Sequence, residues 1–184
     1  INCGSDTSVD NIFVGGGSIS VWINPISDGE AANSRIIDKA GTGWTFRASS
    51  LSASTVDIHF LQEHSTTLGK WITTNAIPIN ELTKITVEYN SDSVSNKPIF
   101  IINGIRMGVG TGLTESSTPA GTAVDDAAHN LLLGDSNAGG ENYEGLIDEV
   151  RISDVSRPTS EAITSYNAEK SDSDIITAGD ENTQ

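Results

Sequence analysis

The stretch YEGLIDEVRISDVSRPTSEAI (Tyr143 to Ile163) decides the fold. Its first half carries apolar residues at close spacing, which predicts a β-strand over residues 144–153. Its second half lacks that pattern and predicts one short helix over residues 157–169, with Thr159 or Ser160 as the N-cap. An acid pair, Asp148 and Glu149, lies inside the strand. The pair raises the question whether this strand carries catalysis, a metal ion or only structure.

The segments before this stretch are short, alternating and separated by turn residues. GSISVWINP (residues 17–25) places Ile19, Val21 and Ile23 on one face and Ser18, Ser20 and Trp22 on the other. Similar strands are predicted at 34–39, 43–49, 55–63, 82–90, 98–108 and 130–136, and the last but one contains a hairpin signal at Asn103-Gly104. The pattern predicts an all-β sandwich of two antiparallel sheets, with a long polar loop over residues 111–130.

Composition narrows the classes of function. The 184 residues suffice for one domain, which we expect over residues 1–170, followed by an acidic tail or linker over 171–184. The formal net charge of −15 argues against a nucleic-acid partner, because such a chain repels phosphate backbones. A single cysteine excludes an internal disulfide, and no apolar run is long enough to predict membrane insertion.

Several of these segments, in this order, resemble a known family. SISVWINP, IIDK with GWTFR, LTKITVEYN, IFIINGIRMG, LLLGD and above all YEGLIDEVRIS are similar to the LamG-like (laminin G/pentraxin) branch of the concanavalin A-like lectin/glucanase superfamily. The resemblance implies a jelly roll whose last strand is residues 144–153. The opening segment, residues 1–25, also resembles versions of the domain in virion and tail proteins of marine bacteriophages. It therefore implies an extracellular, cell-surface or virion location, and virion or surface-protein subunits as further partners.

Enzyme chemistry is not favoured by the residues. Retaining glycoside hydrolases need two carboxyl groups about 5 Å apart, and strict alternation places Asp148 and Glu149 on opposite faces of their strand. His59, His64 and His129 lack metal-ligand spacing, and we interpret His59 as an outward strand position. No nucleophile elbow is present. We therefore predict that the protein is not an enzyme, with a glycoside hydrolase as the least favoured alternative.

Alternation places Asp148 on the same face as Val150 and Ile152, so it would enter the core. Three solutions for such a carboxylate stay open. It accepts hydrogen bonds from a neighbouring strand, pairs with an arginine, or binds Ca²⁺ through roughly six to eight oxygens. The family resemblance implies a structural Ca²⁺ between the first and last strands, for which Asp6, Asp10 and Asp148 are the candidate ligands.

A carbohydrate site needs a flat aromatic ring next to hydrogen-bonding groups. Trp44, Trp71 and Tyr143 lie near predicted strand ends, and Asp135 and Asn137 lie on an adjacent loop. These five are the candidate carbohydrate-binding residues, although sandwiches often bury tryptophan. We predict a non-catalytic module that binds carbohydrate or a cell-surface glycan. The alternative, from another class, is a virion decoration, fibre or adhesin domain that serves assembly or display.

Overall fold

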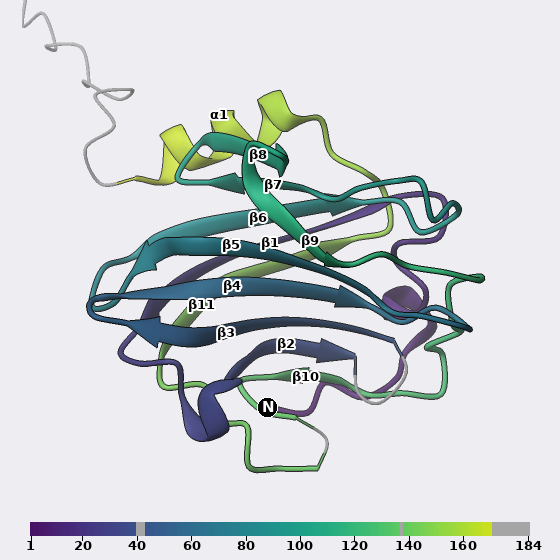
Figure 1. Cartoon of the computed structure of the whole chain (residues 1–184), viewed down its shortest axis with the longest axis horizontal. Coiled ribbons are helices and arrows are strands. Elements are labelled where there is room, and N and C mark those ends of the chain that lie inside the picture. The colour runs from purple at the N-terminus through teal and green to yellow at the C-terminus, as the bar shows by residue number, and fades with distance from the viewer. Residues whose placement is uncertain (40–42, 137, 171–184) are drawn as a thin grey trace, which may run out of the picture.

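The structure of the protein, a computed structural model, describes residues 1–39, 43–136 and 138–170 (Figure 1). The predicted acidic tail and the candidate residue Asn137 lie outside this range. Within it the chain forms a two-sheet sandwich, as predicted. Sheet A runs in the order β10 (Leu131–Leu133), β2 (Arg35–Lys39), β3 (Trp44–Ser52), β4 (Thr55–Gln62), β5 (Gly69–Pro78), β9 (Gly112–Ser117). Sheet B follows as β8 (Ile105–Val109), β7 (Ile99–Ile102), β6 (Thr83–Tyr89), β1 (Gly17–Pro25), β11 (Gly145–Ser153).

All strand pairs are antiparallel except one. β8 and β9 run parallel, through Gly108↔Gly112 and Val109↔Leu113, and this short pair joins the two sheets into one curled order of 11 strands. In Figure 1, β3, β4 and β5 lie in front of β1 and β11, so the sheets stack face to face. Two short 3₁₀ turns, η1 (Thr7–Val9) and η2 (Glu30–Ala32), complete the β-rich part of the fold.

The core lies between the sheets and follows the predicted alternation. Ile19, Val21 and Ile23 of β1 are at most 1% exposed. The same face is continued by the inward residues of the neighbouring strands, namely Phe46, Ile58, Phe60, Ile85, Val87 and Phe100. Phe13 lies at the centre, with its ring 5.4 Å from Trp44 and 5.1 Å from Phe60 between centroids. Such edge-to-face contacts favour one arrangement of the aromatic core.

The hairpin prediction is confirmed. β7 and β8 are joined at Asn103 and Gly104, which have φ angles of 48° and 78°. Both angles are positive, as a type I′ turn requires. Gly104 has a second role, because a Cβ there would lie 2.9 Å from Cδ1 of Tyr166. The glycine therefore lets the C-terminal helix approach the hairpin closely.

Two strands were not predicted. β5 is missing from the expected set, and β9 lies within the region predicted to be a loop without strands. β9 pairs with β5 through Trp71↔Glu115 and Ile72↔Thr114, which makes it the bridge between the sheets. The sequence of β9 is polar and only Leu113 is fully buried, so it lacks the apolar alternation from which a strand is predicted.

The alternation predicted for β11 is wrong at the acid pair. Ser20 pairs with Arg151 but Trp22 pairs with Asp148, so one residue of β1 faces two of β11. This β-bulge centres on Glu149, whose φ angle is 50°. The extra residue turns Asp148 outward, while Val150 packs against the core. Asp148 is thus exposed rather than buried.

The predicted helix is α1 (Thr159–Glu169), and it covers the outer face of sheet B beside β7 and β8 (Figure 1). Pro158 is its N-cap and no side chain caps it, so the expected cap at Thr159 or Ser160 is wrong. Those two residues form the first turn instead, with Glu161 favourably placed near the positive end of the helix dipole. No helix of the described residues is long and apolar enough to cross a membrane.

Candidate functional site

Trp44 and Trp71 do not form the predicted sugar platform. Their side chains are 2% and 0% exposed, so neither ring offers a face to a ligand. Both belong to the central aromatic cluster, where Trp71 stacks on Phe60 with centroids 5.9 Å apart. Burying a ring of this size stabilises the sandwich. Both tryptophans are therefore core residues, although they lie near strand ends.

The predicted loop residues have structural contacts. Asp135 is half-buried, and its Oδ1 accepts hydrogen bonds from the backbone N–H groups of Ser136 (2.7 Å) and Glu141 (3.3 Å). Tyr143 is half-buried against the core, and burial raises the pKa of its hydroxyl. Asn137 lies outside the described residues. The carbohydrate site predicted from the five residues therefore does not form as one surface.

The three candidate calcium ligands are not brought together. Asp6 is exposed and caps η1 by accepting a hydrogen bond from Ser8 N at 2.9 Å. Asp148 is exposed and accepts one from Glu149 N at 2.8 Å. Asp10 instead binds the ammonium of Lys39 at 2.7 Å. Among the described residues no three acidic, histidine or cysteine side chains are grouped to hold a metal ion. The structure therefore does not bring Asp6, Asp10 and Asp148 together as one set of calcium ligands.

Lys39 takes the position that a cation would need. Its side chain is fully buried, and its Nζ lies 2.7 Å from Asp10 and 4.0 Å from Asp126. Burial raises the pKa of Asp126, while a hydrogen bond from Asn11 N and the charge of Lys39 oppose this. The site already contains a protein cation, so its carboxylates do not fit an additional metal ion.

The bulge in β11 also corrects the geometry expected of the acid pair. Asp148 does not face the core, because both Asp148 and Glu149 are exposed, and both line one hollow of about 620 Å³. We call it the aromatic hollow, since Trp22 and Tyr166 also line it, together with Asn103 and Arg151. It lies where the C-terminal end of α1 meets β1, β11 and the hairpin turn.

The two aromatic rings of this hollow come from distant parts of the chain. Trp22 projects from the outer face of β1, and Tyr166 projects from α1 toward it, with centroids 5.9 Å apart. Trp22 is nearly buried by the helix, whereas Tyr166 is half-buried. The hollow thus has an apolar wall beside three carboxylates, an amide, a guanidinium and the ammonium of Lys170, which lies 5.6 Å from the centre of the Tyr166 ring.

Glu169 fixes the end of the helix over this wall. Its carboxylate accepts hydrogen bonds from Lys84 Nζ (2.6 Å), Trp22 Nε1 (2.8 Å), Ser165 Oγ (2.7 Å) and Arg151 (2.6 Å). Burial by itself raises the pKa of Glu169, but these hydrogen bonds outweigh burial and lower the pKa to about 2. The carboxylate is therefore ionised at neutral pH and holds the helix, the tryptophan and the arginine in one arrangement.

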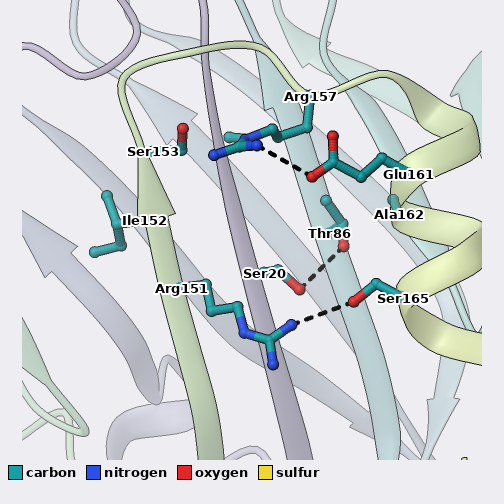
Figure 2. Close-up of a pocket in the computed structure, with 10 residues that line it drawn as sticks. Ser20, Thr86, Arg151, Ile152, Ser153, Arg157, Glu161, Ala162 and Ser165 are labelled. Carbon is teal, nitrogen blue, oxygen red and sulfur yellow. Dashed lines mark hydrogen bonds and ion pairs between the residues drawn. The ribbon is translucent and has the colours of Figure 1, made fainter. Parts of the chain in front are cut away.

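A second, smaller pocket continues the hollow along the helix (Figure 2). It has a volume of about 190 Å³ and contains many hydroxyl groups, so we call it the hydroxyl pocket. Figure 2 shows Ser20 and Thr86 on the sheet, Ser165 on the helix, and Arg151 and Arg157 on either side. Arg151 lines both cavities and donates a hydrogen bond to Ser165 at 3.2 Å. The two cavities are neighbours between α1 and sheet B, with Arg151 lining both, and we call the pair the groove.

Sequence reasoning missed this groove. It did place Trp22 on the face opposite the core, which is confirmed, and it predicted the helix that carries Tyr166. The clue in the sequence is Trp22, a large apolar side chain among the serines of that face. Such a ring indicates that another element of the chain packs over it. The predicted helix is the nearest candidate for this element.

Comparison with known proteins supports the fold. Among solved structures, the heptameric SAP-like pentraxin of Limulus polyphemus matches with a TM-score of 0.56 and 14% identity, over 83% of this chain and 70% of that one. The sialidase CBM40 of Ruminococcus gnavus, solved with α2,3-sialyllactose, matches with a TM-score of 0.58 and 11% identity, over 90% and 92%. The binding domain of botulinum neurotoxin serotype D gives a TM-score of 0.58 and 14% identity, over 86% and 38%.

No curated protein matches the chain by sequence. The family comparison is decisive, because residues 5–163 match the family described as the concanavalin A-like lectin/glucanases superfamily. That match spans both sheets and the first turns of α1, including the groove residues up to Ala162. Sequence and fold agree, and the chain belongs to the concanavalin A-like lectin/glucanase superfamily.

Proposed function

We propose that the domain binds carbohydrate without cleaving it, through the groove between α1 and sheet B. The observation that carries this proposal is the aromatic hollow, where Tyr166 and Trp22 lie beside Asp148, Glu149 and Asn103. An aromatic ring packs on the apolar face of a pyranose, and carboxylates and amides bind its hydroxyl groups. Solved relatives of this fold include a carbohydrate-binding module crystallised with a sialylated sugar, which is consistent with the proposal.

The hydroxyl pocket extends the surface available to a ligand. A sugar ring over Tyr166 would place its neighbour near Arg151, Ser165 and Ser20. Hydroxyl groups both donate and accept hydrogen bonds, so this pocket suits a second sugar ring. The groove as a whole therefore suits an oligosaccharide of two or more units.

The chemistry of the acid pair argues against hydrolysis. A retaining hydrolase keeps one of its two carboxyl groups protonated. Glu149 is 55% exposed and forms an ion pair with Arg151 at 2.9 Å, so its carboxylate already has a cationic partner. Asp148 is also exposed, and its Oδ1 accepts a hydrogen bond from Glu149 N–H, which a carboxylate does readily. Two solvated carboxylates of this kind suit ligand binding better than acid catalysis.

The test is a glycan array probed with the wild-type domain and with two variants of Tyr166. Tyr166→Ala removes the ring, and we expect it to weaken binding of any hit by about two- to twelvefold, since a stacked ring contributes on the order of 0.5–1.5 kcal/mol. Tyr166→Phe keeps the ring and is the matched control, because it removes only the hydroxyl group. A hit that both variants bind like the wild type would move the site elsewhere. A blank array at high protein concentration would refute carbohydrate recognition.

A further inference from the structure

The outer face of sheet A carries two cations without an ion pair to a described carboxylate within 4.0 Å, in a chain with a net charge of −15, although Glu141 and Asp38 act on Arg47 from further away. Arg35 is paired, at 2.9 Å from Glu141 and 3.8 Å from Asp38. Among the described residues, no carboxylate lies within 4.0 Å of the charged groups of Arg47 or Lys70. With 25 acidic and 10 basic residues available, two half-buried cations without an ion pair are unexpected.

His59 lies between these two cations. It pairs across the sheet with Arg47 of β3 and with Ile72 of β5, and Lys70 is the diagonal neighbour, opposite Leu61. The alternation of β4 turns Ile58 and Phe60 into the core, so His59 projects from the outer face. It is nevertheless only 4% exposed. Burial, Lys70 and Arg47 lower the pKa of His59 to about 4, so the ring is neutral at pH 7.

The hydrogen bonds of His59 determine which nitrogen carries its proton. Arg47 Nε donates to His59 Nδ1 at 3.4 Å, so Nδ1 accepts. A neutral ring then carries its hydrogen on Nε2. That Nε2–H is buried and has no hydrogen-bond partner in the described structure. A buried donor without an acceptor is costly, and it indicates that an acceptor belongs there.

We propose that Arg47, His59 and Lys70 form a binding site for a small oxyanion, such as the carboxylate or sulfate group of a ligand. The neutral imidazole supplies one N–H donor, Arg47 a charged fork and Lys70 an ammonium, from three adjacent strands. Charged donors of this kind bind oxyanions through short, strong hydrogen bonds. A depression of about 170 Å³ lies beside Arg47, and the carboxylates of Asp38 and Glu63 also line it, so only its Arg47 side suits an oxyanion. Because Nε2 is buried, binding requires the side chains that cover it to move aside.

This site lies on sheet A, whereas the proposed carbohydrate groove lies on sheet B, so either can fail without the other. An acidic sugar and a free inorganic anion share the chemistry that the site recognises. Sodium glucuronate and sodium sulfate are therefore both used as probes. Glucose and sodium chloride, at matched concentration and ionic strength, are the controls for the sugar ring and for salt.

The readout is the NMR signal of the His59 imidazole in the whole domain at pH 7. We expect a saturable shift with at least one oxyanion and none with glucose or chloride. Arg47→Gln and Lys70→Gln should each weaken binding about tenfold, because each removes a charged hydrogen bond. Lys97→Gln is the matched control, since Lys97 pairs with Glu115 instead. Lys70 forms no hydrogen bond or ion pair with a described residue, so its variant removes no such contact from the fold.

The outcomes separate cleanly. A shift with glucuronate alone assigns the site to a carboxylate-bearing sugar, and a shift with sulfate as well extends it to sulfate groups and free oxyanions. A His59 signal that responds to neither probe would overturn the proposal. Equal affinity of wild type and Lys70→Gln would also overturn it. The Tyr166→Ala variant should keep the His59 response, whatever the glycan array shows.

Discussion

Lys39 offers the strongest test of how the interior is held together. Its fully buried ammonium lies 2.7 Å from Asp10 and 4.0 Å from Asp126, whose side chains are 12% and 3% exposed. Lys39→Met keeps the length of the side chain but removes its charge. Two largely buried carboxylates then lose their cation. Removing one partner of a buried ion pair costs roughly 3–5 kcal/mol, far more than the pair contributes over an apolar replacement.

The assay is thermal unfolding at pH 7. For a domain of this size, each kcal/mol lowers the melting temperature by about 2–4 °C, so Lys39→Met should lower it by about 6–20 °C. Lys97→Met is the matched control, because Lys97 forms an equally short pair, 2.6 Å from Glu115, but is 32% exposed. Its loss should cost under about 1 kcal/mol. The double variant Lys39→Met with Asp10→Leu should recover part of the stability, since it removes one uncompensated carboxylate. Equal losses for Lys39→Met and Lys97→Met would refute the reasoning.

Three further predictions concern pH and metal. The pKa of Glu169 is lowered to about 2 from an ordinary 4.5, so its stabilisation is complete above pH 4.5 and is lost as the pH falls toward 2. Glu169→Gln should therefore cost about 1–2 kcal/mol in urea unfolding at pH 7, because solvent screens this partly exposed cluster, and the difference from wild type should shrink as the pH falls toward 2. The pKa of His59 is lowered to about 4 from 6.5, so stability should fall by about 3 kcal/mol as the pH falls from 6.5 through 4, and His59→Gln should remove that slope. Because Asp148 is exposed, the melting temperature should be the same in calcium and in EDTA, and a calcium-dependent rise that Asp148→Asn abolishes would contradict the structure.

Local pattern predicted the strands whose two faces differ in polarity. β1 was predicted with the bounds it has, Gly17–Pro25, because apolar and polar residues alternate along it without a break. β5 was not predicted because the fully buried residue Thr73 is polar, and an apolar residue at this position would have indicated a strand. β9 escaped because it is short, polar and pairs in parallel with β8 over only two residues.

Each wrong prediction of a site residue has a separate physical cause. A non-glycine residue with a φ angle of 50°, Glu149, shifted the faces of β11, and nothing in the local sequence predicts such a bulge. Trp44 and Trp71 are core residues because of contacts with Phe13 and Phe60, which the sequence brings from distant segments. The proposed oxyanion site could not be predicted from the sequence because it includes Lys70, which lies on the unpredicted strand β5. His59 was correctly placed outward, but its partners come from long-range pairing.

The two ends of the sheet order also affect how copies of this domain can meet. β10 is covered by the N-terminal segment, with Ile1 bonded to Leu133 O at 2.6 Å and Cys3 N bonded to Leu131 O at 2.8 Å. β11, at the other end, is interrupted by the bulge at Glu149. Sheet edges of this kind are poor templates for a strand from another molecule. Many copies packed densely on one surface would therefore stay separate domains instead of fusing into fibrils, and any assembly of them would depend on side-chain contacts.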